Sequence, residues 1–306
     1  MNNCPVCNSI SLNFLREYKG RSPLFIDKKL MKCSGCEFVF ASPLPDNKEL
    51  AEYNSKYFLN AHGGNSTHPV AVAFHSAINK IRANHVLDYA KGSGVKIKKV
   101  LEIGPGLGFI LKYFKDQYPE VEYSIIESDV ENLSKLKNLA FSHFENLDYA
   151  PKDYFDLVIV SHVLEHTNDP IAFSSKLLEK INSSGILFIE VPNEDYKFKV
   201  EDEPHLLFFN KYSMGRLLDQ LALKNIAITN HGPNIEEGMV RKFFIRLYHL
   251  IDHTLTKFKI LLPAHIFYGS YKKLLSSREI VSILPFDAIL SKDSPSWWLR
   301  VVAQKK

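Results

Sequence analysis

The chain has 306 residues, of which 45% are hydrophobic and 24% charged, with a net charge of +4. This apolar content excludes a disordered chain, and 14 Gly and 15 Pro exclude a collagen-like or low-complexity one. No apolar run approaches the roughly 18 residues that a membrane span needs. The start, MNNCPVCNSI, also lacks the regions of a secretory signal. We therefore expect a cytoplasmic protein with one large domain and an attachment, or with two domains.

The four cysteines form two C-x-x-C pairs within residues 1–45: Cys4, Cys7, Cys33 and Cys36. A reducing compartment disfavours disulfides, whereas four soft thiolates fill a closed tetrahedral zinc site. Because such a site leaves no position for water, the zinc would be structural. The pattern predicts a small zinc ribbon, and the alternative is four unrelated free cysteines.

A helical linker is predicted next, in residues 46–94, with Asp46 as its N-cap and KGSG as its end. From Lys98 the pattern changes to strands that alternate with helices. Strands are predicted at 99–104, 122–128, 155–162, 186–192 and 225–232, and helices at 108–118, 129–140, 170–182 and 211–222. This alternation predicts an α/β fold over residues 95–306, with a doubly wound, Rossmann-like sheet.

A helical insertion is predicted at 235–290, before a last strand in SWWLRVVAQK. Its apolar residues recur at steps of three and four: Val240, Phe244, Leu247, Ile251, Leu255, Phe258 and Leu262. An apolar face of this length needs a cover. Residues 238–306 carry 12 Lys or Arg against 4 Asp or Glu, which suits an anionic surface. We expect packing on the same chain or in a homodimer, ahead of a peripheral membrane contact through 239–262.

The most informative segment is VLEIGPGLGF at 100–109, where a buried strand runs into Gly104, Gly106 and Gly108 and then a helix. Glycines allow a ligand to approach the backbone, and a helix start offers free N–H groups. The dinucleotide fingerprint would need its third glycine at Phe109. Glu127 ends the next strand, where a carboxylate can accept hydrogen bonds from both ribose hydroxyls. The alternative is a tight turn with no ligand.

The run from Glu102 to Gly108, followed by Glu127, resembles motif I of class I S-adenosylmethionine-dependent methyltransferases. FDLVIVSHVLEHTNDP and LLEKINSSGILFIEVPN resemble later motifs of the same family, so the resemblance covers about 95–232 and 295–305. It implies an enzyme that uses S-adenosylmethionine. The cofactor-binding residues that it implies are Glu102, Gly104, Pro105, Gly106, Gly108, Glu127, Asn146, Leu147, Ser161, His162 and His166.

The cysteine pairs, followed by Tyr53 and Tyr57, also resemble the start of a methyltransferase group that includes C-methyltransferases of deoxysugar nucleotides. His205 lies where such enzymes place a base near the acceptor. The resemblance therefore implies His205, Glu203 and Tyr57 as catalytic residues. Those sugar enzymes carry Glu directly before this His, where this chain has Pro204. This departure favours an oxygen acceptor over a carbon acceptor.

The expected function is methyl transfer to a small-molecule acceptor, an oxygen of a sugar or of a phosphorylated glycan intermediate. Alternatives are a nucleotide-sugar C-methyltransferase, an RNA methyltransferase whose ribbon binds its substrate, and a non-enzymatic zinc-ribbon module with a degenerate cofactor fold. Residues 93–200 carry 12 Lys against 17 Asp or Glu, which argues against nucleic acid. The intact glycines and Glu127 argue against degeneration.

Overall fold

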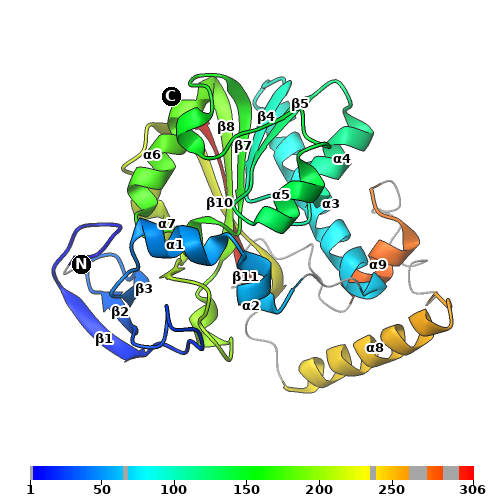
Figure 1. Cartoon of the computed structure of the whole chain (residues 1–306), viewed down its shortest axis with the longest axis horizontal. Coiled ribbons are helices and arrows are strands. Elements are labelled where there is room, and N and C mark those ends of the chain that lie inside the picture. Colours follow the sequence, from blue (N-terminus) through cyan, green and yellow to red (C-terminus); the bar gives the residue numbers. More distant parts are fainter. Residues whose placement is uncertain (1–2, 65–67, 235–238, 262–273, 285–295) are drawn as a thin grey trace.

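The computed structural model describes residues 3–64, 68–234, 239–261, 274–284 and 296–306, with the backbone alone at 233–234 and 239–242. A seven-stranded sheet lies at its centre, in the order β10-β11-β8-β7-β4-β5-β6 (Figure 1). The strands are β4 (Lys99–Ile103), β5 (Glu122–Ile126), β6 (Ser142–His143), β7 (Phe155–Ser161), β8 (Ile181–Pro192), β10 (Leu223–Asn234) and β11 (Ser296–Lys305). Strands β6, β5, β4, β7 and β8 pair in parallel, whereas β11 runs antiparallel between β8 and β10.

Helices cover both faces of this sheet, because successive strand residues point to opposite sides. Val100 and Ile125 pack under α3 (Pro69–Gly92) and α4 (Phe109–Gln117), beside α5 (Val130–Leu136). Leu101 and Val158 face α6 (Pro170–Lys180) and α7 (Lys211–Leu218). The predicted α/β architecture is confirmed. Strand β6 was not predicted, because two residues are too few to show a period.

The cysteine-rich segment forms a second, four-stranded sheet in the order β1-β2-β3-β9. Strands β1 (Leu12–Glu17), β2 (Lys29–Cys33) and β3 (Val39–Ser42) come from this segment, but β9 (Leu207–Phe208) comes from the chain after β8. The guanidinium of Arg16 adds two bonds to the Asp202 carboxylate, at 2.6 and 2.7 Å. The amino-terminal sheet is therefore tied to the segment that carries His205.

The predicted helical linker forms three helices: α1 (Asn47–Asn54), α2 (Tyr57–His62) and α3. Asp46 caps α1 as predicted: its carboxylate accepts from the Glu49 backbone N–H, and the Glu49 carboxylate accepts from that of Asp46, both at 2.8 Å. Helix α3 ends at Gly92, inside the predicted KGSG end. The breaks after α1 and α2 turn the chain so that α2 lies across the carboxyl ends of the central strands (Figure 1).

The described part of the predicted insertion contains α8 (Met239–Lys257) and α9 (Ser277–Ile283). Helix α8 lies at the edge of the molecule (Figure 1). It turns polar groups inward, since Tyr248 donates to the Val281 carbonyl and Arg278 pairs with Asp252. The exposed apolar side chains of α8 and of the residue after it are Phe243, Phe244, Leu247, Leu250, Ile251 and Phe258. Phe244, Leu247, Ile251 and Phe258 of the predicted stripe are therefore left uncovered by the described part of the chain, while the Val240 and Leu262 side chains lie outside that part. None of the described helices is long and apolar enough to cross a bilayer.

Candidate active site

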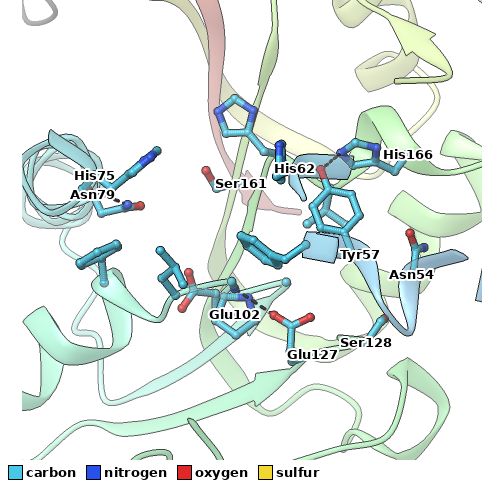
Figure 2. Close-up of a pocket in the computed structure, with 18 of the residues that line it drawn as sticks. Asn54, Tyr57, His62, His75, Asn79, Glu102, Glu127, Ser128, Ser161 and His166 are labelled. Atoms are coloured by element: carbon cyan, nitrogen blue, oxygen red, sulfur yellow. Dashed lines mark hydrogen bonds between the residues drawn. The ribbon is translucent and has the colours of Figure 1, made fainter. Parts of the chain in front are cut away.

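A cavity of about 540 Å³ lies at the carboxyl ends of β4, β5 and β7 (Figure 2). This is the switch point of the sheet, where β4 has β5 on one side and β7 on the other, and such points form ligand crevices. The walls come from the loop after β4, the ends of β5 and β7, and helices α1 to α3. The lining residues are Asn54, Tyr57, Phe58, His62, Gly64, His75, Asn79, Arg82, Glu102, Gly104, Pro105, Gly106, Leu107, Phe109, Glu127, Ser128, Ser161, His162, Val163 and His166.

The glycines of the loop after β4 all have left-handed backbone conformations, with φ of +63° at Gly104, +56° at Gly106 and +69° at Gly108. A Cβ on Gly104 would lie 2.6 Å from Val163 Cγ2, and one on Gly108 would lie 2.5 Å from Leu136 Cδ2. The glycines therefore let the loop turn and pack closely against the β7 loop and α5. This close packing leaves the loop backbone on the cavity wall.

The Glu127 carboxylate lies on the cavity wall (Figure 2) and accepts hydrogen bonds from two backbone donors. The N–H groups of Gly106 and Asp129 each donate to one of its oxygens, at 2.9 Å. Burial raises the pKa of this carboxyl group. Because a carboxylate offers about four acceptor positions, these two bonds leave room for the two hydroxyls of a ribose.

Glu102 is a second carboxyl group of the cavity, at the end of β4. It is fully buried, and the Tyr123 hydroxyl donates to it at 2.7 Å. Burial raises the pKa of Glu102 to about 7. The cavity therefore holds two carboxyl groups whose burial favours the neutral form, and a cationic ligand would favour their ionisation.

The end of β7 brings the predicted Ser161, His162 and His166 to the cavity. The Ser161 hydroxyl is buried without a hydrogen-bond partner among the described residues. His166 donates from Nδ1 to the Pro204 carbonyl at 3.2 Å, and its Nε2 lies 3.3 Å from the Tyr57 hydroxyl. Burial lowers the pKa of His166 to about 4, so its imidazole is neutral and Nε2 accepts.

Several predicted site residues do not line the cavity. The Asn146 side chain accepts from the Asp148 N–H and caps the short helix η1 (Leu147–Tyr149). The Glu203 carboxylate accepts from the backbone N–H groups of Arg21 and Ser22, at 2.6 and 3.1 Å, and so faces the amino-terminal sheet. His205 is buried behind His166. Of the predicted catalytic set, Tyr57 does line the cavity.

The sequence analysis missed the polar wall that α1 to α3 contribute. His75, Asn79 and Arg82 follow one another at steps of four and three residues, which places them on one face of α3. All three line the cavity. That spacing could have predicted a polar face on α3, whereas no pattern in the sequence predicts that Asn54 or Phe58 lines the cavity.

The four cysteine sulfurs converge in the amino-terminal sheet. Cys4 Sγ lies 3.6 Å from Cys36 Sγ, and Cys7 Sγ lies 3.5 Å from Cys33 Sγ. All four sulfur atoms lie within 4.8 Å of one another. Thiolates bound at about 2.3 Å around a tetrahedral zinc would lie about 3.8 Å apart. The cluster is therefore compatible with a metal ion.

Comparison with known proteins gives the family. Residues 74–232 match the family model described as a methyltransferase domain, and this match spans more than half of the chain. The chain belongs to this methyltransferase family, and it is an S-adenosylmethionine-dependent enzyme with a Rossmann-like fold, as the sequence predicted.

Individual relatives are distant. The ubiquinone biosynthesis O-methyltransferase of Aliivibrio fischeri is 25% identical over 176 residues, which cover 50% of this chain and 74% of that protein. A SAM-dependent methyltransferase from Archaeoglobus fulgidus is 18% identical, with a TM-score of 0.46 over 85% of this chain and 100% of that chain. Phosphoethanolamine N-methyltransferase 2 of Haemonchus contortus, solved with S-adenosyl-L-methionine, is 14% identical, with a TM-score of 0.49 over 87% of this chain and 61% of that chain.

Proposed function

We propose that the enzyme transfers a methyl group to an oxygen of a small, hydroxyl-rich acceptor, a sugar or glycan intermediate. The observation that carries this proposal is the polar wall that α1 to α3 contribute to the cavity, beside the glycine loop and Glu127. Asn54, His75 and Asn79 offer amide and imidazole groups, which pair well with hydroxyls. The volume lies within the roughly 300–1,000 Å³ of small-molecule sites.

An oxygen acceptor is supported by the curated relative, which is named as an O-methyltransferase. The sulfonium methyl of the donor is already activated, so the protein mainly has to hold donor and nucleophile in line. Tyr57 and Ser161 both line the cavity and carry hydroxyls, and that of Tyr57 lies 3.3 Å from His166 Nε2. In this proposal they orient the acceptor oxygen toward the donor.

The proposal includes a structural zinc on Cys4, Cys7, Cys33 and Cys36. Its support is the convergence of the four sulfurs. Thiolates stay available for zinc only where disulfides do not form, so the proposal includes a reducing compartment such as the cytoplasm. The zinc would hold the amino-terminal sheet, which in turn fixes the segment that carries His205.

Donor binding is tested first, by calorimetry with S-adenosylmethionine. Glu127→Ala should weaken binding at least tenfold, because it removes charge-assisted bonds to the ribose, each of which contributes about 1.5–3 kcal/mol. The control is Glu131→Ala, since Glu131 is exposed on α5 and pairs with Lys135 across one turn. Equal binding by both variants would overturn the ribose assignment.

The acceptor is tested with methyl-labelled donor against free sugars, phosphorylated sugars, nucleotide sugars and RNA. Label on a sugar oxygen, located by mass spectrometry, is the expected result. Tyr57→Phe should lower turnover and leave donor affinity near wild type. Label on a sugar carbon or on RNA would overturn the proposal in favour of another methyltransferase class. Donor binding without transfer to any of these acceptors would also count against it.

A further inference from the structure

Behind the cavity, two histidines and a carboxylate converge from segments far apart in the sequence. Glu165 and His166 lie on η2 (Leu164–His166), and His205 lies in the segment before β9. One ligand atom from each residue falls within 4.8 Å of the others. We propose that Glu165, His166 and His205 bind a divalent transition-metal ion, at a site separate from the four cysteines.

Both imidazoles are oriented as metal ligands require. His166 uses Nδ1 on the Pro204 carbonyl, and His205 uses Nδ1 on the Asp195 carboxylate at 2.7 Å. Metal-binding histidines usually donate their second N–H to such a carbonyl or carboxylate, which fixes the tautomer and leaves Nε2 for the ion. Both rings are largely buried, so these orientations are set by packing.

The carboxylate supplies the second observation. The Glu165 side chain is 0% exposed, and its Oε1 lies 3.2 Å from His162 Nδ1 and 3.9 Å from His166 Nε2. Its Oε2 has no hydrogen-bond partner among the described residues. A buried carboxylate oxygen without a partner is costly unless a cation fills the place. The imidazole pair with this carboxylate forms a donor set that suits Mn²⁺, Fe²⁺ or Zn²⁺.

The site opens onto the cavity through His166 and Tyr57. An ion on His166 Nε2 would take the lone pair that now accepts from the Tyr57 hydroxyl. With three protein ligands it would keep open positions for an acceptor hydroxyl, whose proton it would make more acidic. This role rests on the proposed methylation of an oxygen, whereas binding of the ion does not.

Mn²⁺ is the appropriate probe, because it favours oxygen and nitrogen ligands over the thiolates of the cysteine cluster. Free Mn²⁺ is followed by electron paramagnetic resonance as protein dialysed without chelator is added, so that any zinc on the four cysteines stays bound. The wild type should take up one Mn²⁺ per chain. Glu165→Gln keeps the shape of the side chain and should bind at least tenfold more weakly, as should His205→Ala. Asp195→Asn, a positioning change, should weaken binding roughly 10–100-fold.

His143→Ala is the control, because His143 is exposed on β6 and belongs to neither cluster. Donor affinity, measured by calorimetry without the ion, reports separately on the methyltransferase function. Absence of Mn²⁺ uptake by the wild type would overturn the site. Uptake that is unchanged in both Glu165→Gln and His205→Ala would overturn it as well.

A second inference comes from α8. A surface helix usually turns its apolar face to the protein body and its polar face outward, and α8 does the reverse. Its polar residues Tyr248 and Asp252 face the body, whereas Phe243, Phe244 and Phe258 are 63%, 59% and 71% exposed. Soluble monomers rarely expose an apolar face of this kind without a partner. We infer that this face rests on an anionic lipid surface.

The positive charge of this segment favours a lipid surface over a second copy of the chain as the partner of the exposed face. Arg246, Lys257 and Lys259 are exposed on the same segment, and Arg278 already pairs with Asp252. A symmetric contact between two copies would place this basic helix against itself. An anionic bilayer instead attracts the basic residues and buries the aromatic ones, as interfacial helices do.

Co-sedimentation with vesicles tests the lipid contact. The wild type should bind vesicles of phosphatidylcholine with phosphatidylglycerol at low salt, and bind phosphatidylcholine alone at least tenfold more weakly. Phe244→Ser combined with Phe258→Ser should weaken binding to the anionic vesicles at least tenfold. Phe141→Ser, which changes an equally exposed aromatic residue outside α8, should leave binding unchanged. A wild type that stays in solution, or a lipid-free dimer that the double variant abolishes, would overturn the inference.

Discussion

Gly104 in the loop after β4 occupies a position that leaves no room for a side chain. Gly104 has a φ of +63°, and a Cβ there would lie 2.6 Å from Val163 Cγ2. We expect Gly104→Ala to cost several kcal/mol of unfolding free energy and to weaken donor binding, because both the backbone and the β7 loop must shift.

Gly92 at the end of α3 is the matched control for Gly104. A Cβ on Gly92 would meet no atom within 4 Å, and its φ is not in the left-handed range. Gly92→Ala should therefore be neutral or stabilise by less than about 1 kcal/mol. Denaturant unfolding of both variants checks the pair, and equal stabilities would contradict the loop geometry.

Glu102 predicts a pH dependence of stability. Its pKa is raised by burial from 4.5 to about 7, so the folded state holds a proton that the unfolded state has lost between these values. The stabilising contribution of the neutral group is thus complete below pH 4.5 and declines as the pH rises through 7. Relative to Glu102→Gln, the wild type should lose on the order of 3 kcal/mol between pH 4.5 and pH 8. A difference between the two unfolding free energies that stays constant with pH would contradict this account.

At the scale of elements, a buried carboxylate joins three of them. Glu190 of β8 accepts from Arg82 of α3 and from Arg300 of β11, and its side chain is fully buried. Glu190→Ala leaves two buried guanidinium groups without this partner, so we expect a loss of about 3–5 kcal/mol in unfolding free energy. The exposed pair of Glu131 and Lys135 is the comparison, where Glu131→Ala should cost less than about 1 kcal/mol. A loss below 1 kcal/mol in Glu190→Ala would contradict the proposed bridge.

The whole molecule depends on the link between its two sheets. Strand β9 pairs with β3, and the Tyr18 hydroxyl donates to the His205 carbonyl at 2.8 Å. Chelation of a zinc on the four cysteines should therefore speed hydrogen exchange at Leu207–Phe208 as well as in β1 to β3. Donor binding should remain, because the glycine loop and Glu127 belong to the central sheet.

Exchange, rather than turnover, is the readout for this link, since a chelator would also empty the site on Glu165, His166 and His205. Cys4→Ser is the control, because a protein without the fourth thiolate should exchange quickly before any chelator is added. Slow exchange at Leu207–Phe208 in the chelated wild type would show that β9 does not depend on the ribbon.

The sequence predicted the features that arise within one short segment. The strand, the three glycines and the following helix lie within 99–117, and the capping box lies within 46–49, so period and spacing reveal them. The doubly wound α/β sheet followed from the alternation of strands and helices, whereas the order of its strands came from the structure. Asn146 and Leu147 were predicted to bind the cofactor but do not line the cavity, because loops between strands carry no periodic signal that would position them.

Contacts between distant segments were decided only by the tertiary structure. Glu190 meets Arg82 108 residues away, and Arg16 meets Asp202 186 residues away. A pattern shows that α8 has an apolar face, but not whether that face turns inward, since this depends on which polar partners the body offers. The sequence alone determined the methyltransferase sheet and the glycine loop after β4. The polar wall, the His–His–Glu cluster and the outward face of α8 depended on how separate elements pack, because burial and pairing are properties of the whole fold.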